Sequence, residues 1–213
     1  MARSALALAA VLLAAGAAFA AVTAGFSAVT SDGIRRVQLR QSPRDLPALA
    51  LVDAQGREFP LADYGRGGGR LTTFVSLVYL KCQSVCRTTV AGQSWLQHAI
   101  ASRGLQDRLR LLTLSFDPYN DTPAVMRGYA GRMGAQPASW RFATVRDPAD
   151  LQGMLDLFGI VVLPDGMGGY VHNAALFMID ETGRLARAYD IDRPDLALAD
   201  YLQQQQRERH AGR

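Results

Sequence analysis

The sequence predicts an α/β fold, a three-layer sandwich around a mixed central sheet with an N-terminal β-hairpin. First, 213 residues with 49% hydrophobic content suffice for one domain with a sizeable core. Second, segments typical of strands alternate with segments typical of helices over residues 71–159. Third, two further strand-like segments and a last helix follow, which indicates that antiparallel pairs extend a parallel sheet.

The first residues of the chain are strongly apolar. After Arg3, the next charged residue is Asp32. A run of about 20 apolar residues suffices for a membrane anchor, whereas the short basic start and the small-x-small segment at residues 18–20 suit a secretory signal peptide. We therefore expect residues 1–26 to be a membrane anchor or a signal peptide, and both alternatives export the rest of the chain.

A linker and a β-hairpin are expected next. Residues 27–46 are expected to form a linker, because most of this segment is polar, rich in arginine and without periodicity. Residues 48–64 suit a short hairpin that turns at Gln55-Gly56, and they open a main domain expected over residues 47–206. The glycine-rich residues 65–70 lack the lysine and hydroxyl residue of a phosphate-binding loop, so they are expected to be a connection only.

Three buried strands, each followed by a helix, are predicted in the middle of the chain. β-Branched and aromatic residues dominate the strand segments, which are residues 71–80, 109–117 and 140–145. The first helix is expected after the two cysteines and up to Gly104. The second and third begin at Thr122 and Asp147, because each of these is a preferred N-cap residue followed by proline.

The C-terminal part is expected to complete the sheet. Residues 170–180 and 184–190 are typical of two strands joined by a turn at residues 181–183. Residues 192–206 suit a helix, and residues 207–213 are expected to be a polar tail.

The distribution of charge excludes one class of partner. The net charge of +4 comes almost entirely from arginines scattered along the chain, and no basic cluster is interleaved with aromatic residues. We therefore expect no nucleic acid among the partners of this protein.

The two cysteines of the chain, Cys82 and Cys86, directly follow a predicted buried strand. Functional sites of open α/β sheets gather at such strand ends. Disulfides persist in exported proteins, but a bridge that closes so short a loop restrains the unfolded chain very little. A structural disulfide is therefore a poor explanation of this pair, although a redox pair and a metal site both remain open.

The spacing of the cysteines suits a soft metal ion. If a helix begins near Cys82, both sulfurs lie on one face of it, and the helix amino terminus together with Lys81 favours the thiolate forms. Thiolates select Cu(I) or zinc, and imidazole suits either ion. Of the three histidines, His172 precedes a predicted strand in a turn-like setting, whereas His98 lies within a helix and His210 in the tail.

From near Ala50 to near Gln205 the chain resembles the Sco/SenC family of thioredoxin-like copper proteins. The landmarks are, in order, a tyrosine shortly before "CQSVC", the segment "LSFDPYNDTP", Trp140, and "YVHNAALFMIDETGRL". Each landmark alone is common, but their order and spacing make the resemblance specific. It implies a thioredoxin-like fold for this domain.

The resemblance also implies a copper site. Its ligands would be Cys82, Cys86 and His172, with copper bound as Cu(I), and whether Cu(II) also binds stays open. Asp117 matches an acidic position beside the site of the family, although it could equally serve only to shape the turn before the next proline. Lys81, directly before the first cysteine, is a second candidate neighbour of the ligands.

The surroundings of these ligands depart from the family pattern. Gln83 and Arg87 stand where the family usually has proline, and Asn120 stands where its Asp-Pro turn usually carries arginine. Val171 and Asn173 flank the histidine, where the family usually has aspartate before it and serine or threonine after it.

The function implied by the resemblance is that of a copper metallochaperone on the periplasmic side of the inner membrane. It would assist assembly of the dinuclear copper site of cytochrome c oxidase. The expected partners are oxidase subunit II or a similar copper-accepting protein, a copper-donating chaperone, and the membrane through the N-terminal segment. Copper transfer by ligand exchange needs no catalytic acid or base.

The alternative is a dedicated thiol-disulfide oxidoreductase that reduces the cysteines of the oxidase subunit, with Cys82 and Cys86 as its redox pair. A general thioredoxin fits less well, because it would more usually have two residues between its cysteines. The thioredoxin fold would also present a cis-proline to the cysteines, where this chain has valine, histidine and asparagine.

Overall fold

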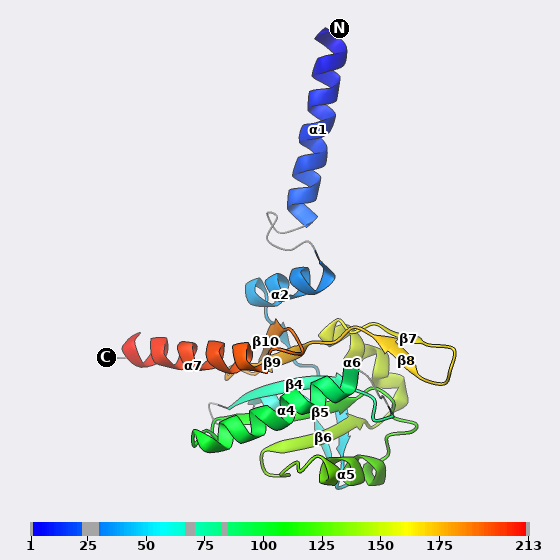
Figure 1. Ribbon diagram of the computed structural model, residues 1–213, viewed down its shortest axis with the longest axis vertical. Coiled ribbons are helices and arrows are strands. Elements are labelled where there is room, and N and C mark those ends of the chain that lie inside the picture. The colour runs from blue at the N-terminus through cyan, green and yellow to red at the C-terminus, as the bar shows by residue number, and fades with distance from the viewer. Residues whose placement is uncertain (1, 23–29, 67–70, 82–84, 212–213) are drawn as a thin grey trace.

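The computed structural model describes residues 2–22, 30–66, 71–81 and 85–211. Side chains are not described for residues 2–5, 22, 31, 65–66, 85–88 and 211 within these ranges. Helix α1 (Ala2–Val22) stands apart from the other elements, which form one domain (Figure 1). Among the helices of the described ranges, none is both long enough and apolar enough to cross a membrane.

The main sheet has eight strands in the described part of the chain, in the order β1-β10-β9-β4-β5-β6-β2-β3. β4, β5 and β6 are parallel, and the remaining neighbours pair antiparallel, so the sheet is mixed as predicted. The strands are β1 (Arg44–Asp45), β2 (Ala50–Asp53), β3 (Glu58–Pro60), β4 (Thr72–Val78), β5 (Leu109–Ser115), β6 (Trp140–Val145), β9 (Leu176–Ile179) and β10 (Arg184–Tyr189).

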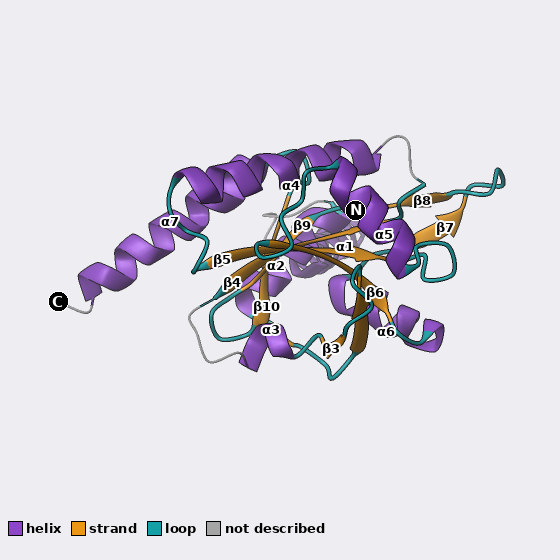
Figure 2. Ribbon diagram, turned by 90° about the horizontal axis from the view of Figure 1, so that it is seen from below, coloured by secondary structure: helices purple, strands orange, loops and turns teal. Residues whose placement is uncertain are grey.

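Helices cover both faces of this sheet and complete three layers (Figure 2). Side chains of β4 alternate between the faces: Val75 and Leu77 pack with residues of α2 and α6, and Phe74 packs with residues of α4, α5 and α7. The helices are α2 (Ser31–Gln41), α3 (Asp63–Arg66), α4 (Val85–Ser102), α5 (Pro123–Arg132), α6 (Leu151–Phe158) and α7 (Pro194–Ala211).

Several predicted elements are confirmed. β2 and β3 form the N-terminal hairpin, whose turn places Gly56 in the left-handed region at φ 78°. Thr122 caps α5 by accepting a hydrogen bond from the Val125 N–H. Asp147 also caps a helix as predicted, but the first turn there is a 3₁₀ helix (Pro148–Asp150) that leads into α6.

The prediction that residues 27–46 form a linker is wrong from Ser31 onward. α2 begins there with Thr30 as its N-cap, lies along β10, and is followed by β1. The helix buries Leu39 completely and Arg35 almost completely. The buried side chains described for this helix are one leucine and one arginine, which packs through its aliphatic part. Such a pair gives no apolar periodicity in the sequence, so the helix could not be predicted from it.

The predicted strand over residues 170–180 is in fact two strands in two sheets. β8 (Tyr170–His172) pairs with β7 (Val162–Pro164) in a separate two-stranded ribbon, whereas β9 begins at Leu176 and joins the main sheet. The ribbon extends away from the domain (Figure 1). A continuous apolar run carries no signal for a change of sheet, so the sequence could not divide it.

The prediction of a polar tail after residue 206 also needs correction. α7 continues to Ala211. Gln204 donates a side-chain hydrogen bond to Glu208, and the His210 ring bonds to the Gln206 carbonyl, so contacts of i,i+4 spacing accompany the helix through this polar segment.

Candidate metal centre

The two cysteines follow the carboxyl end of β4, where α4 begins. Cys82 lies outside the described residues, as do Gln83 and Ser84. Cys86 is the second residue of α4 and therefore belongs to its first turn, and its side chain is not described. The sequence predicts a helix that starts near Cys82, and the structure describes α4 from Val85 onward.

His172 lies at the same edge of the sheet, at the end of β8. Its Nδ1 atom is 2.9 Å from the carbonyl oxygen of Asn173. Because a carbonyl oxygen only accepts hydrogen bonds, Nδ1 carries the proton, and the lone pair of the neutral ring is on Nε2. This tautomer suits metal coordination through Nε2.

Aromatic side chains pack around the His172 ring. Its centroid lies 4.9 Å from that of Phe116 and 6.2 Å from that of Tyr79, both in edge-on geometry. Tyr79 and Phe116 are buried, and Tyr170 packs edge-on against both. Since Tyr79 precedes Cys82 by three residues, these contacts bring the histidine to the chain segment that leads into the cysteine pair.

A close approach at Gly169 holds the ribbon against Tyr79. The backbone N–H of Tyr170 donates to the Tyr79 hydroxyl at 3.3 Å. A Cβ atom at Gly169 would lie 3.0 Å from that hydroxyl and 2.6 Å from an oxygen of Asp165. Asp165 is itself fixed by the backbone N–H groups of Met167 and Gly169. Glycine is therefore the residue that lets β8 reach the end of β4.

Asp117 and Lys81 are linked through Asn120. Asp117 is 4% exposed, and the Asn120 side-chain amide lies 2.9 Å from both of its carboxylate oxygens. Lys81, which is exposed, donates from Nζ to Asn120 Oδ1 at 3.4 Å. The negative charge of Asp117 is the main cause that raises the pKa of the Tyr170 hydroxyl. Asp117 thus lies beside the aromatic cluster around His172.

Asp121 fixes the backbone just before the cysteines, a role that the sequence did not indicate. Its Oδ2 atom accepts hydrogen bonds from the Leu80 N–H at 2.9 Å and from the Ser115 hydroxyl at 2.5 Å. Burial raises the pKa of the Asp121 carboxyl above its ordinary value, and these two hydrogen bonds oppose that shift.

The other two histidines have local partners on their own helices. His98 on α4 and His210 on α7 each bond through Nδ1 to the backbone carbonyl four residues earlier, Ser94 and Gln206 respectively. Within the ranges that the structure describes, no three histidine, cysteine, aspartate or glutamate residues gather into a potential metal site. The side chains of Cys82 and Cys86 are not among the described ones.

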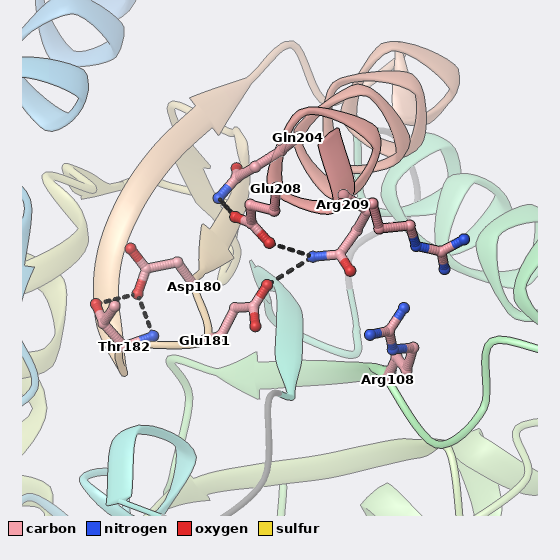
Figure 3. A pocket seen from close by; sticks show the side chains of 8 residues that line it. Arg108, Asp180, Glu181, Thr182, Gln204, Glu208 and Arg209 are labelled. Atoms are coloured by element: carbon pink, nitrogen blue, oxygen red, sulfur yellow. Dashed lines mark hydrogen bonds between the residues drawn. The ribbon is translucent and has the colours of Figure 1, made fainter. Parts of the chain in front are cut away.

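A cavity of about 500 Å³ lies at the other edge of the sheet (Figure 3). It adjoins the end of β9, whereas His172 precedes the start of β9. Its polar side chains largely satisfy one another: Gln205 donates to Glu181 at 2.6 Å and to Glu208 at 3.2 Å. This cavity is therefore separate from the candidate metal centre. It is lined by Arg108, Asp180, Glu181, Thr182, Gln204, Gln205, Glu208 and Arg209.

Comparisons with known proteins give a consistent result. A family model described as SCO1/SenC matches residues 40–206. A SCO1 protein homolog from Bacillus subtilis is 20% identical over 115 residues, which are 53% of this chain and 58% of that relative. The matched region thus spans less than two thirds of that relative's length.

Solved structures share the fold. ScoI from Bradyrhizobium japonicum, solved with copper bound, is 22% identical with a TM-score of 0.58, and the match covers 73% of this chain and 96% of that one. BsSco, described as a member of the Sco family of cytochrome c oxidase assembly proteins with a disulfide switch, is 16% identical with a TM-score of 0.63. That match covers 75% of this chain and 92% of BsSco.

Proposed function

The chain belongs to the SCO1/SenC family, and on this premise we propose that it is an exported copper-binding protein that assists the assembly of cytochrome c oxidase. Two relatives of the same fold support the two parts of this proposal. ScoI from Bradyrhizobium japonicum is solved with copper bound, and BsSco is described as a member of a family of oxidase assembly proteins. This chain keeps the two cysteines and the histidine that a soft copper site requires.

The proposed ligands of Cu(I) are Cys82, Cys86 and His172. The observation that carries this assignment is the setting of the histidine: its Nδ1–H donates to the Asn173 carbonyl, so its Nε2 lone pair can serve a metal. The same ring packs against Tyr79, three residues before the first cysteine. Because a backbone hydrogen bond and packing already hold the imidazole, metal binding costs it little further conformational entropy.

Copper is the cargo of this site in our proposal. Two thiolates and one neutral imidazole would give Cu(I) a soft site of low coordination number, which a partner's thiols can enter by ligand exchange. The position of Cys86 in the first turn of α4 favours its thiolate. Lys81, directly before Cys82 in the sequence, adds a positive charge to this segment. Tyr79 and Phe116 pack edge-on against the imidazole.

The proposed recipient is subunit II of the oxidase, at its dinuclear copper site, with a separate chaperone as the copper donor. We place the domain on the periplasmic side of the inner membrane, because residues 4–22 are uncharged and precede the domain. Residues 1–26 would either anchor the protein or be removed as a signal peptide. An intact-mass measurement on protein isolated from its host separates these two alternatives.

The second candidate function is that of a dedicated thiol-disulfide oxidoreductase acting on the cysteines of the oxidase subunit. The position of Cys86 at the amino terminus of α4 supports it, because a helix amino terminus favours the thiolate, which is the form that attacks a disulfide. BsSco, whose description reports a disulfide switch, supports it as well. Copper(II) binding is compatible with either function and forms no part of the assignment.

A competition titration separates the two functions. The reduced protein is titrated with Cu(I) against a competing chelator without oxygen, alongside His172→Ala and, as a matched control, His98→Ala on the exposed face of α4. We expect one tight equivalent that is retained in the control and weakened about tenfold or more in His172→Ala. No tight binding, together with disulfide exchange that is insensitive to His172, would contradict the copper function and favour the reductase.

A further inference from the structure

Asn173 stands where the family usually has serine or threonine, and its side chain makes two backbone hydrogen bonds. Oδ1 accepts from the Val161 N–H at 2.8 Å, and Nδ2 donates to the Gly159 carbonyl at 3.1 Å. Both backbone groups lie between the end of α6 and the start of β7. The side chain of serine or threonine is shorter and ends in one hydroxyl group. It therefore lacks the separate donor and acceptor atoms with which the planar carboxamide of asparagine makes this bridge.

This bridge extends the ladder of the β7–β8 ribbon. His172 pairs with Val162 as the last rung of the backbone ladder. The side-chain amide of Asn173 then bonds to the Val161 N–H and the Gly159 carbonyl. It thus supplies one acceptor and one donor, as a backbone residue in the ladder would. The backbone of Asn173 is therefore fixed relative to α6, although the residue belongs to neither strand.

The fixed backbone of Asn173 includes the carbonyl that faces His172. That carbonyl accepts the Nδ1–H of the imidazole at 2.9 Å. If Asn173 lost its bridge, its backbone would lose the two side-chain hydrogen bonds that fix it relative to Gly159 and Val161. The carbonyl would then no longer hold Nδ1 in its protonated form. This carbonyl only accepts hydrogen bonds, so its contact with Nδ1 favours the tautomer that carries the proton on Nδ1.

The carbonyl oxygen that accepts from Asn173 also accepts a hydrogen bond from α2. Arg35 donates from a guanidinium nitrogen to the same Gly159 carbonyl at 2.9 Å. Arg35 is 7% exposed, bonds to Asp32, and lies with its guanidinium carbon 5.4 Å from the centre of the Phe177 ring. The Gly159 carbonyl is thus a fixed point shared by α2, α6 and the segment that follows β8.

We propose that Asn173 is a positioning residue of the metal centre: its bridge to Gly159 and Val161 selects the Nδ1–H tautomer of His172 and presents Nε2 as the ligand atom. Arg35 supports this arrangement by holding the Gly159 carbonyl. The consequence for copper rests on the proposed function, because it requires His172 to be a ligand. Selection of the tautomer does not require copper.

Nuclear magnetic resonance of the imidazole nitrogens tests the tautomer directly. The full-length, metal-free protein carries ¹⁵N-labelled histidine and is measured at about pH 8, where an ordinary imidazole is neutral. His98→Gln and His210→Gln assign the resonances. We expect the Nδ1–H form of His172 in the wild type and in the exposed control Gln206→Ala, and a clear rise of the Nε2–H form in Asn173→Ala.

Asn173→Asp is the second variant, and it keeps the size of the side chain and the acceptor for the Val161 N–H. An ionised aspartate has no donor for the Gly159 carbonyl, so we expect the Nε2–H form to rise here too. This variant provides the comparison even if Asn173→Ala does not fold. An Nε2–H form in the wild type, or an unchanged tautomer in both Asn173 variants, overturns the inference.

Copper affinity distinguishes failure of this inference from failure of the proposed function. Loss of an outer contact to a metal-binding histidine typically weakens metal binding by about 10–100-fold, so we expect Asn173→Ala to weaken Cu(I) binding by about tenfold and Gln206→Ala not to. Tight copper binding that is insensitive to Asn173 overturns the positioning role while the proposed function stands. A tautomer that depends on Asn173 in a protein without copper affinity supports selection of the tautomer by Asn173 and contradicts the proposed function.

Discussion

Asp121 joins two segments of the candidate centre through a single carboxylate oxygen. It accepts the Leu80 N–H just before the cysteine segment and the Ser115 hydroxyl at the end of β5. Burial raises the pKa of this carboxyl, which means that the folded protein binds its proton more tightly than the unfolded chain does. The stabilising contribution of the protonated form is therefore fully present below the ordinary aspartate pKa of about 3.9 and is lost as the pH rises through the raised value.

Asp121→Asn should remove this dependence, since an amide does not titrate. We expect the free energy of unfolding of the wild type to fall relative to that of the variant as the pH rises upward from about 3.9. Urea unfolding of both proteins over a series of pH values measures the difference. A difference that is constant with pH, or one that grows in favour of the wild type, would contradict the assigned setting of Asp121.

Single residues were predictable to different degrees. His172 could be proposed because it precedes a predicted strand and matches a family motif. Asp121 and Asn173 could not be found in this way, because their roles depend on backbone partners that are distant in sequence: Leu80 for Asp121, and Gly159 for Asn173. A side chain that bonds to a distant backbone group leaves no periodic pattern.

Among the elements, α2 changes the domain organisation most. Its residues were expected to belong to a linker, but the helix packs along β10 and contributes Leu39 to the core. It also supplies Arg35 to the Gly159 carbonyl. The folded unit that contains the candidate centre therefore begins before the expected boundary at residue 47.

Leu39→Ala tests whether α2 is an integral part of the fold. Leu39 is fully buried, so its truncation should lower the free energy of unfolding by about 2–5 kcal/mol. Gln38→Ala, at the adjacent exposed position of the same helix, should change it by no more than about 0.5 kcal/mol. Chemical denaturation compares the three proteins, and an equally small effect of both substitutions would show that α2 does not contribute to the core.

Elements with a strong local signal were predicted well. The runs that became β4, β5 and β6 are apolar and rich in β-branched residues, and α5 has both an N-cap threonine and a following proline. The short β7 and the division between β8 and β9 were missed, because pairing partners are set by the tertiary fold and not by local composition. The ribbon that carries His172 is therefore an element that only the three-dimensional structure defines.

At the scale of the whole molecule, the strand order explains how a site can form from distant segments. β9 lies antiparallel beside β4, so the start of β9 and the end of β4 share one edge of the sheet. His172 precedes β9, and the cysteine segment follows β4. The sandwich architecture and its mixed sheet were predictable from the order of the elements, whereas this particular neighbourhood required the observed strand order.

Copper binding to a site built from separate segments should stabilise the entire domain. A ligand that binds only the folded state raises the free energy of unfolding by about 2.7 kcal/mol at a free concentration of 100 times its dissociation constant. We expect buffered Cu(I) to raise the melting temperature of the reduced wild type and of His98→Ala, and to raise it less for His172→Ala. Equal shifts in all three proteins would indicate binding elsewhere on the molecule.

The central claim is that Cys82, Cys86 and His172 together hold one Cu(I) ion, and X-ray absorption spectroscopy at the copper edge tests it most directly. The reduced protein loaded with one equivalent of Cu(I) should give a coordination shell of two sulfur atoms and one nitrogen atom with the scattering pattern of imidazole. His172→Ala should lose the imidazole pattern, and His98→Ala should keep it. A shell of sulfur alone in the wild type, or an imidazole signal that persists in His172→Ala, would contradict the claim.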